Sequence, residues 1–210
     1  MIEYHKIEGL FRRDEETKKL MYGEFRNPTI EFLKDNKWEF TEKIDGTNIS
    51  IVWDGHKVSY HGRTERAQIP TQLLDRLIEL FGGDVNEQIF EQNFGERQVI
   101  LYGEGYGAKI QNGGNYKDTQ DFILFDVMIG NNYQSRETVN DVAKMFNLEV
   151  VPIVLTGTIE EGINFVKGKP KSTIGTADME GVVGRPQVEL RDRCGSRAIV
   201  KIKVADFKEW

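Results

Sequence analysis

Short runs of apolar residues, several of them alternating with polar ones, dominate this chain and predict β-strands. Alternation gives a strand one buried and one solvated face, and a short unbroken apolar run is typical of a strand buried on both faces. The predicted strands cover residues 38–44, 49–54, 57–61, 97–103, 121–129, 148–155, 180–185 and 197–204.

Helical spacing of apolar residues appears in fewer places, as inserts between the strands. Residues 71–81 carry it and stop before two glycines, and residues 85–94 carry a weaker version. Ser135 is a suitable N-cap for a further helix, and Thr158 with Glu161 forms a capping-box pattern ahead of another. We therefore predict an α+β fold with mixed or antiparallel sheets flanked by helices, with residues 1–210 as a single domain.

Composition places the chain among folded globular proteins, because 39% of its 210 residues are hydrophobic. No apolar run approaches the roughly 20 residues of a membrane span, and the N-terminus lacks the apolar core of a signal peptide, so we expect a cytoplasmic protein. The single cysteine, Cys194, excludes an intrachain disulfide, and three scattered histidines argue against a Cys/His zinc site. Any metal is expected to be oxygen-bound, which favours Mg²⁺ or Mn²⁺.

The net charge of −6 argues against a nonspecific coat on nucleic acid, although it leaves room for a local basic groove. Basic residues gather in two places, which are either such a groove or ordinary solvated faces. One cluster is Arg12, Arg13, Lys18, Lys19 and Arg26, and the other is Lys167, Lys169 and Lys171.

A candidate nucleophile, Lys43, lies in the segment 42–48, whose sequence is Glu-Lys-Ile-Asp-Gly-Thr-Asn. Strand-like runs lie on both sides, and Asp45-Gly46 between them predicts a hairpin in which glycine supplies a positive φ. Lys43 would then sit at the end of a strand, aimed from a rigid scaffold. A lysine amine with its proton removed is a nucleophile.

Two further lysines, Lys201 and Lys203, are two residues apart in the strand-like run 197–204 and therefore point to the same face. Two cations side by side favour an anion, and phosphate is the usual one. The alternative is an exposed edge strand that carries lysines for protection against aggregation.

Four more positions could carry chemistry, each with a plain structural alternative. Arg63 follows a strand beside glycine and could bind phosphate or ribose, or be an ordinary turn residue. Glu104 lies among three glycines, where backbone can approach a ligand closely. Phe125 could be a core residue, and Glu180 could hold a hydrated metal or simply end a strand.

Together these positions resemble, in order, the covalent nucleotidyltransferase superfamily of polynucleotide ligases and mRNA capping enzymes. The elements that carry the resemblance are Lys43-Ile44-Asp45-Gly46, Arg63, Glu104, Phe125-Asp126-Val127, Glu180-Gly181-Val182-Val183 and Lys201-Ile202-Lys203. Asn48 and the run 103–111 are more similar to RNA ligases than to DNA ligases or capping enzymes. The chain also ends seven residues after Lys203, so we expect a minimal ATP-grasp-like adenylation domain with no C-terminal OB-fold or helical domain.

The resemblance implies an ATP-dependent RNA ligase, with a role in RNA repair. Lys43 would take AMP from ATP, AMP would pass to an RNA 5′-phosphate, and an RNA 3′-hydroxyl would then displace it. The resemblance assigns a role to each residue: Lys201 and Lys203 on the α-phosphate, Glu180 on Mg²⁺ or Mn²⁺ directly or through water, Glu104 on the ribose hydroxyls, Phe125 stacked on adenine, Arg63 on ribose or the RNA phosphate, Asp45 and Asn48 in positioning, and Glu42 near the adenine-selecting backbone.

Three alternatives stay open at this point. The chain could be an ATP-dependent DNA ligase or nick-adenylylating enzyme, a capping enzyme that prefers GTP, or a nucleotide-binding module without catalysis. The acidic balance also leaves open whether RNA binding uses a partner protein, a dimer or a preformed nick.

Overall fold

The structure is a computed structural model that describes residues 3–64 and 66–207. Its contacts divide the chain into two compact units, each built from two segments of sequence. Unit 1 contains residues 1–5 and 45–151, and unit 2 contains residues 6–44 and 152–210. This division does not test the expected single domain, which stays a prediction. Within the described ranges no helix is long and apolar enough to cross a membrane.

Unit 1 is built on a six-stranded sheet. Its strands run in the order β5 (Val58–His61), β4 (Thr47–Trp53), β6 (Val99–Tyr106), β7 (Asp121–Ile129) and β8 (Asn132–Tyr133), with β9 (Glu149–Val150) beside β7. All pairings are antiparallel except that of β7 with β9. A bulge between Tyr102 and Gly103 interrupts the register of β6 with β7.

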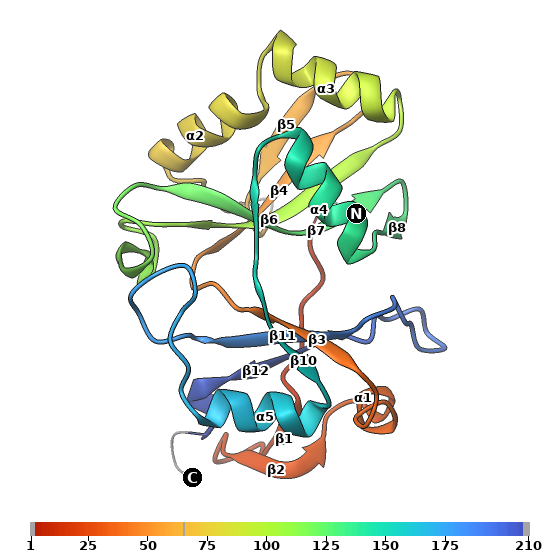
Figure 1. Ribbon diagram of the computed structural model, residues 1–210, viewed down its shortest axis with the longest axis vertical. Coiled ribbons are helices and arrows are strands. Elements are labelled where there is room, and N and C mark those ends of the chain that lie inside the picture. Colours follow the sequence, from red (N-terminus) through yellow and green to blue (C-terminus); the bar gives the residue numbers. More distant parts are fainter. Residues whose placement is uncertain (1–2, 65, 208–210) are drawn as a thin grey trace. The chain divides into compact units, whose positions relative to one another are not determined.

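Three helices of unit 1 share one core with this sheet: α2 (Thr71–Phe81), α3 (Asp84–Phe94) and α4 (Arg136–Met145). They lie along the sheet in Figure 1, and a short 3₁₀ turn, η1 (Gly113–Asn115), precedes β7. Alternate residues of β4, namely Ile49, Ile51 and Trp53, belong to the core. The intervening residues, which include Asn48 and Ser50, therefore point to the opposite face of the sheet.

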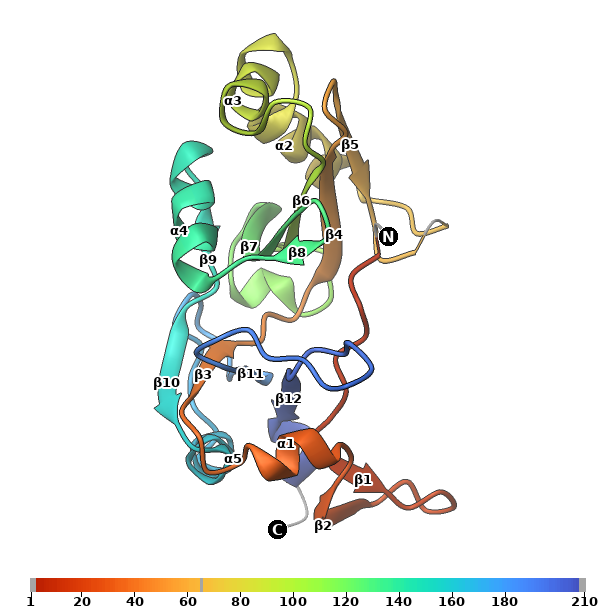
Figure 2. The same cartoon turned by 90° about the vertical axis from the view of Figure 1, so that its right-hand side faces the viewer.

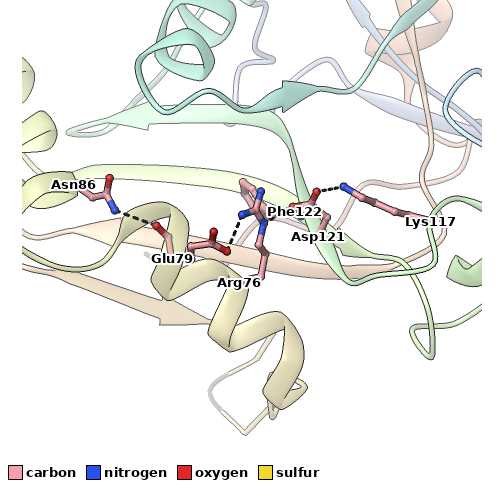
Figure 3. A network of polar contacts seen from close by, with 6 residues as sticks. All are labelled: Arg76, Glu79, Asn86, Lys117, Asp121 and Phe122. Carbon is pink, nitrogen blue, oxygen red and sulfur yellow. Dashed lines mark hydrogen bonds and ion pairs between the residues drawn. The ribbon is translucent and has the colours of Figure 1, made fainter.

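A polar network ties α2 to the start of β7 (Figure 3). Arg76 donates to Asp121 Oδ1 at 3.0 Å and to Glu79 Oε2 at 2.8 Å, and Lys117 also pairs with Asp121. Burial raises the pKa of Asp121, but the bonds from Lys117, the Phe122 backbone and Arg76 outweigh it, so its pKa lies below the ordinary value. Asp121 is therefore held ionised at the entry to β7.

Unit 2 is built on a four-stranded antiparallel sheet in the order β10 (Ile153–Gly157), β3 (Trp38–Glu42), β11 (Gly181–Pro186) and β12 (Val200–Lys203). Helix α5 (Ile159–Lys167) packs on one face, against residues that include Phe40, Val200 and Ile202. Because Val200 and Ile202 face the helix, Lys201 and Lys203 face the other way.

The N-terminal part of unit 2 adds a two-stranded ribbon, β1 (Phe11–Arg13) with β2 (Leu20–Phe25), and the short helix α1 (Pro28–Phe32) (Figure 2). Ahead of β1, Gly9 forms a parallel bridge with Lys201. Residues 8–9 thus lie along the outer edge of β12. A 3₁₀ turn, η2 (Val204–Phe207), follows β12.

Most predicted elements are confirmed. The helix over residues 71–81 matches α2, Ser135 caps α4 through the Thr138 amide, and Thr158 with Glu161 forms the capping box of α5. The predicted strand 148–155 is two strands instead, because Pro152 lies between β9 and β10.

The predicted hairpin at Asp45-Gly46 is wrong. Strand β3 pairs with β10 and β11, whereas β4 pairs with β5 and β6, so the two strands belong to different sheets. Gly46 is not among the residues with positive φ. Glycine is needed at position 46 for a steric reason instead, because a Cβ there would lie 2.3 Å from the Gly105 carbonyl oxygen.

Candidate functional site

A cluster of one carboxylate and three lysines lies on the side of the unit 2 sheet away from α5. Lys43 Nζ donates to Glu180 Oε2 at 2.5 Å, and Lys203 Nζ lies 2.6 Å from Glu180 Oε1. The side chains of Lys43, Glu180 and Lys203 are between 23% and 33% exposed, so they are largely shielded but still accessible to solvent. Both carboxylate oxygens are thus held by lysine amines.

The pairing of three strands produces this cluster. Glu42 lies opposite Val182, and the Lys43 amide donates to the Gly181 carbonyl at 3.0 Å, so Lys43 extends β3 beside the start of β11. On the other side of β11, Gly181 lies opposite Lys203. Gly181 has no room for a side chain, because a Cβ would lie 2.2 Å from the Ile202 carbonyl oxygen. Residues 137 apart in sequence therefore meet at one strand end.

The electrostatics of Lys201 and Glu180 show that the cluster is short of negative charge. Burial lowers the pKa of Lys201, repulsion from Lys203 and Lys43 lowers it further, and attraction to Glu8 only partly opposes them. Burial raises the pKa of Glu180, but attraction to Lys43 and Lys203 outweighs burial, so its pKa lies below 4.5. None of the carboxylates in the described ranges lies within ion-pair distance of Lys201. A half-buried cation with no carboxylate in direct contact favours a bound anion.

A divalent cation fits this cluster in one way. No group of three or more His, Cys, Asp or Glu residues in the described part of the chain could hold a metal by itself. Mg²⁺ commonly binds through one or two carboxylates together with substrate phosphates and water. Glu180 is the carboxylate that the cluster offers, so a metal here would be shared with a phosphate ligand.

Glu42 precedes Lys43 but points elsewhere. Its side chain is 2% exposed and accepts hydrogen bonds from Ser172 Oγ at 2.5 Å, Thr173 N at 2.9 Å and Thr173 Oγ1 at 2.6 Å. Both carboxylate oxygens are thereby occupied, and the bonds anchor the loop that leads to Glu180. Any contact of Glu42 with a nucleotide in this arrangement would come from its backbone.

Unit 1 carries the other predicted site residues, and Asn48 and Glu104 lie directly opposite each other on β4 and β6. Ser50 pairs with His61 on β5, so the same register continued by two residues would set Arg63 opposite Asn48. Arg63 is exposed in the bend that follows β5. The sheet thus brings Asn48 and Glu104 together, with Arg63 at its margin.

Asn48 has an unmet hydrogen-bond requirement. Its Oδ1 atom is buried, and no donor in the described ranges reaches it. Leaving a buried acceptor unsatisfied costs about 1–3 kcal/mol, so such an atom in a native fold calls for a missing partner. A ligand that donates a hydrogen bond beside Glu104 fits this need.

Phe125 lies on the same side of the sheet as Tyr102. Its ring meets the Tyr4 ring edge-on at 5.0 Å, and Tyr4 also contacts Tyr102 at 4.8 Å. Phe125 is half-buried, whereas Phe122 and Leu124 belong to the helix-side core. Because Tyr102 and Glu104 are two residues apart on β6, the Phe125 ring is on the face that carries Glu104.

The glycines beside Glu104 serve the core. A Cβ on Gly103 would lie 2.3 Å from the Phe122 ring, and one on Gly105 would lie 2.4 Å from Leu73. These glycines therefore admit core side chains on the helix side, where we expected room for a ligand. Asp45, at the start of unit 1, is held by Asn112, which donates to its Oδ2 at 2.8 Å, and its amide donates to the Tyr116 hydroxyl at 3.3 Å.

A model of the family described as RNA ligase matches residues 36–203, which is most of the chain. The chain belongs to the RNA ligase family. No curated protein matches it significantly. This membership confirms the resemblance that was drawn from the order of the motifs along the sequence. The predicted α+β fold with antiparallel sheets is confirmed as well.

Solved structures of an RNA ligase from Naegleria gruberi share the fold. The form with pyrophosphate has 21% identity and a TM-score of 0.65 over 87% of this chain and 53% of that one. A mutant with ATP and Mn has 21% identity and a TM-score of 0.65 over 95% and 55% of the two chains. A second mutant with ATP and Mn has 22% identity and a TM-score of 0.63 over 84% and 52%. The chain thus spans about half the length of the structures it matches.

Sequence reasoning missed several residues that contact the predicted site residues Glu42, Asp45 and Phe125. They are Ser172 and Thr173 on Glu42, Asn112 and Tyr116 on Asp45, and Tyr4 on Phe125. Each lies far along the sequence from its partner. No local pattern of spacing or charge in the sequence could have revealed them.

Proposed function

We propose that this chain is an ATP-dependent RNA ligase, which joins RNA 3′-hydroxyl and 5′-phosphate ends through an AMP attached to Lys43. The observation that carries the proposal is the cluster itself, in which Lys43 and Lys203 share Glu180 while Lys201 has no carboxylate within ion-pair distance in the described ranges. Membership of the RNA ligase family supports it.

In the first step Lys43 Nζ, with its proton removed to solvent, attacks the α-phosphorus of ATP. The N–P bond forms, the bond from the α-phosphorus to the bridging oxygen breaks, and pyrophosphate leaves with the electron pair. Lys201 and Lys203 stabilise the negative charge that develops on the α-phosphate, because both side chains project from the same face of β12. Glu180 holds Lys43 and Lys203 in place before the nucleotide arrives.

A divalent metal such as Mg²⁺ or Mn²⁺ would be held by Glu180, directly or through water, and would offset phosphate charge. The Naegleria ligase structures with ATP and Mn are compatible with this choice of ligand and metal. Metal binding would require Glu180 to release at least one of its lysine contacts. That exchange would leave Lys43 free to turn toward the phosphate.

The nucleoside contacts belong to unit 1 in this proposal. Glu104 accepts hydrogen bonds from the ribose hydroxyls, and Phe125 stacks on adenine. Asn48 uses its unsatisfied Oδ1 as an acceptor for the ligand. Arg63 binds ribose or the RNA phosphate, Asp45 positions the segment after Lys43, and the backbone at Glu42 contributes to adenine selection.

The later steps transfer AMP to an RNA 5′-phosphate and then release it as a 3′-hydroxyl attacks. We place this activity in RNA repair in the cytoplasm, a reducing compartment compatible with the exposed free thiol of Cys194. The net charge of −6 supports a requirement for a partner protein, a second copy or a preformed nick when RNA binds.

The proposal is tested by incubating the protein with Mg²⁺ and ATP or GTP labelled on the α-phosphate, followed by denaturing electrophoresis. We expect covalent label from ATP, none from GTP, and transfer of the label to a 5′-phosphorylated RNA. The protein is first treated with pyrophosphate to remove bound AMP. Label from GTP would indicate a capping-type enzyme, transfer to DNA alone would indicate a DNA ligase, and no label would reject catalysis.

A further inference from the structure

The end of β3 is held by a side chain as well as by the sheet. The Glu42 carboxylate is 2% exposed and accepts hydrogen bonds from Ser172 Oγ at 2.5 Å and from the amide and hydroxyl of Thr173 at 2.9 and 2.6 Å. Hydrogen bonds to an ionised acceptor are stronger than bonds between neutral groups, and burial strengthens them further. We call these three bonds the Glu42 clamp.

The donors of the clamp lie in a loop that is closed on itself. The Ser172 amide donates to the Ala177 carbonyl at 3.0 Å. Lys171 and Asp178 form an antiparallel bridge, and their side chains pair at 2.6 Å. The loop 170–179 thus has its own internal support, and its hydroxyl donors are held in place against the strand.

The clamp and the candidate nucleophile lie on opposite faces of the same strand end. Alternation along β3 places Glu42 on the face of Trp38 and Phe40, which belong to the unit 2 core. Lys43 follows Glu42 and therefore points to the other face, where it contacts Glu180. The clamp thus holds the strand from the face opposite the Lys43 amine.

The position of the clamp matters because strand ends are prone to fray. Lys43 is the first residue after β3, and its amide donates to the Gly181 carbonyl at 3.0 Å. Its side chain is long, so a small rotation of the strand end displaces the amine by a larger distance. A displacement of about 1 Å at a reacting group can lower a rate about 100-fold. Fixing Glu42 therefore limits where the Lys43 amine can lie.

We propose that Ser172 and Thr173 are positioning residues for adenylylation. Through the Glu42 carboxylate they set the position from which Lys43 attacks the α-phosphorus of ATP. The inference rests on the proposed function and adds two residues outside the lysine cluster. Both hydroxyls donate to a buried carboxylate on the other face of the strand, so they act through Glu42 and take no part in the bond changes at phosphorus.

Single-turnover adenylylation separates positioning from stability. Wild type, Ser172→Ala and Thr173→Val are treated with pyrophosphate to remove AMP, desalted, and mixed with Mg²⁺ and saturating ATP labelled on the α-phosphate. Each variant should show a rate constant about tenfold lower, because the nucleophile is less often in place. The final labelled fraction should be unchanged, whereas loss of folded protein would lower that fraction and leave the rate constant as it is.

Conservative variants keep the test independent of folding. Thr173→Ser retains the hydroxyl and should restore the wild-type rate constant. Thr173→Val has nearly the shape of threonine and keeps the amide bond to Glu42, so it should fold even if Ser172→Ala does not.

Thr158→Val is the matched control. Thr158 also belongs to unit 2, where its hydroxyl accepts the Glu161 amide at 3.3 Å in the capping box of α5. The substitution removes the same hydroxyl from another part of unit 2 and should destabilise the helix. It should nevertheless leave the rate constant of adenylylation at the wild-type value.

RNA that already carries AMP on its 5′-phosphate provides a second comparison. Joining this RNA to a 3′-hydroxyl needs no attack by Lys43, so Ser172→Ala and Thr173→Val should join it at the wild-type rate. An equal fall in this reaction would overturn the positioning of Lys43.

Wild-type rate constants of adenylylation in Ser172→Ala and Thr173→Val would also overturn it, as would an equal fall in Thr158→Val. These outcomes reject the clamp alone, because wild type would still take label from ATP. If wild type took no label, the proposed function would fail and the role of the clamp with it.

Discussion

At the scale of single residues, the two lysines of β12 have different surroundings although they are only two positions apart. Lys203 pairs with Glu180. Lys201 is half-buried and repelled by neighbouring lysines, and no carboxylate of residues 3–64 and 66–207 lies within ion-pair distance of it. In the proposed reaction both charges act on the α-phosphate, whereas we expect only Lys203 to stabilise the fold through an ion pair.

Lys201→Met should lower the rate of adenylylation at least about tenfold, because a charge-assisted phosphate contact is lost, and should raise stability at neutral pH. The sign follows from linkage: the pKa of Lys201 is lower in the folded state than its ordinary 10.5, so the charged form opposes folding below the folded pKa. Urea unfolding should show a gain at pH 7 that disappears above pH 10.5.

Lys203→Met is the comparison, because it should also slow adenylylation but lower stability by removing a partner of Glu180. A near-normal rate in Lys201→Met would return that residue to the role of a surface lysine. Equal stability effects in the two variants would contradict the difference in their surroundings.

Glu180 should make stability depend on pH in the acid range. Its pKa is lower in the folded state than its ordinary 4.5, so its contribution is complete above that value and is lost as pH falls through the folded pKa. The difference in unfolding free energy between wild type and Glu180→Gln should therefore be largest above pH 4.5 and shrink below it. A difference that stayed constant from pH 3 to 7 would show that the ion pairs contribute nothing.

At the scale of elements, close backbone approach decides where the chain turns from β3 to β4. Gly46 has the Gly105 carbonyl oxygen where a Cβ would be, and this contact sets the start of β4 beside the end of β6. The same pairing places Asn48 opposite Glu104. The position of two predicted site residues therefore depends on the absence of one side chain.

Gly46→Ala should cost at least about 1–3 kcal/mol of unfolding free energy, because the added methyl group forces backbone to move. Gly114→Ala is the control, since nothing lies within 4 Å of its Cβ position and its φ is not positive. Chemical denaturation of both variants measures the difference. Equal stability of the two would refute the close approach.

Local sequence signals predicted the elements that depend on local interactions. The capping box of α5 and the apolar spacing of α2 are satisfied within a few residues, and both were predicted correctly. The β1–β2 ribbon and α1 were missed because they are short. Their apolar residues pack in the unit 2 core against segments that are far away in the sequence. The hairpin prediction was wrong because an Asp-Gly turn between two strands does not determine which other strands β3 and β4 pair with.

At the scale of the whole molecule, both units are discontinuous in sequence, and the predicted site residues are divided between them. The ordered residues predicted that Lys43, Glu180 and Lys203 belong to one site, and these three side chains do meet, while their roles stay predictions. Sequence order could not predict that the Glu42 carboxylate is occupied by hydrogen bonds from Ser172 and Thr173. Those bonds depend on long-range packing that no local pattern encodes.

The proposed role of Lys43 as the residue that carries AMP is tested by locating the adenylyl group on the protein. Protein incubated with ATP and Mg²⁺ is digested under mildly alkaline conditions that preserve a phosphoramidate, and its peptides are sequenced by mass spectrometry. We predict one adenylyl group on Lys43, and no such peptide from Lys43→Ala. An adenylyl group on Lys201 or Lys203, or an unmodified chain, would contradict the role of Lys43 as the nucleophile.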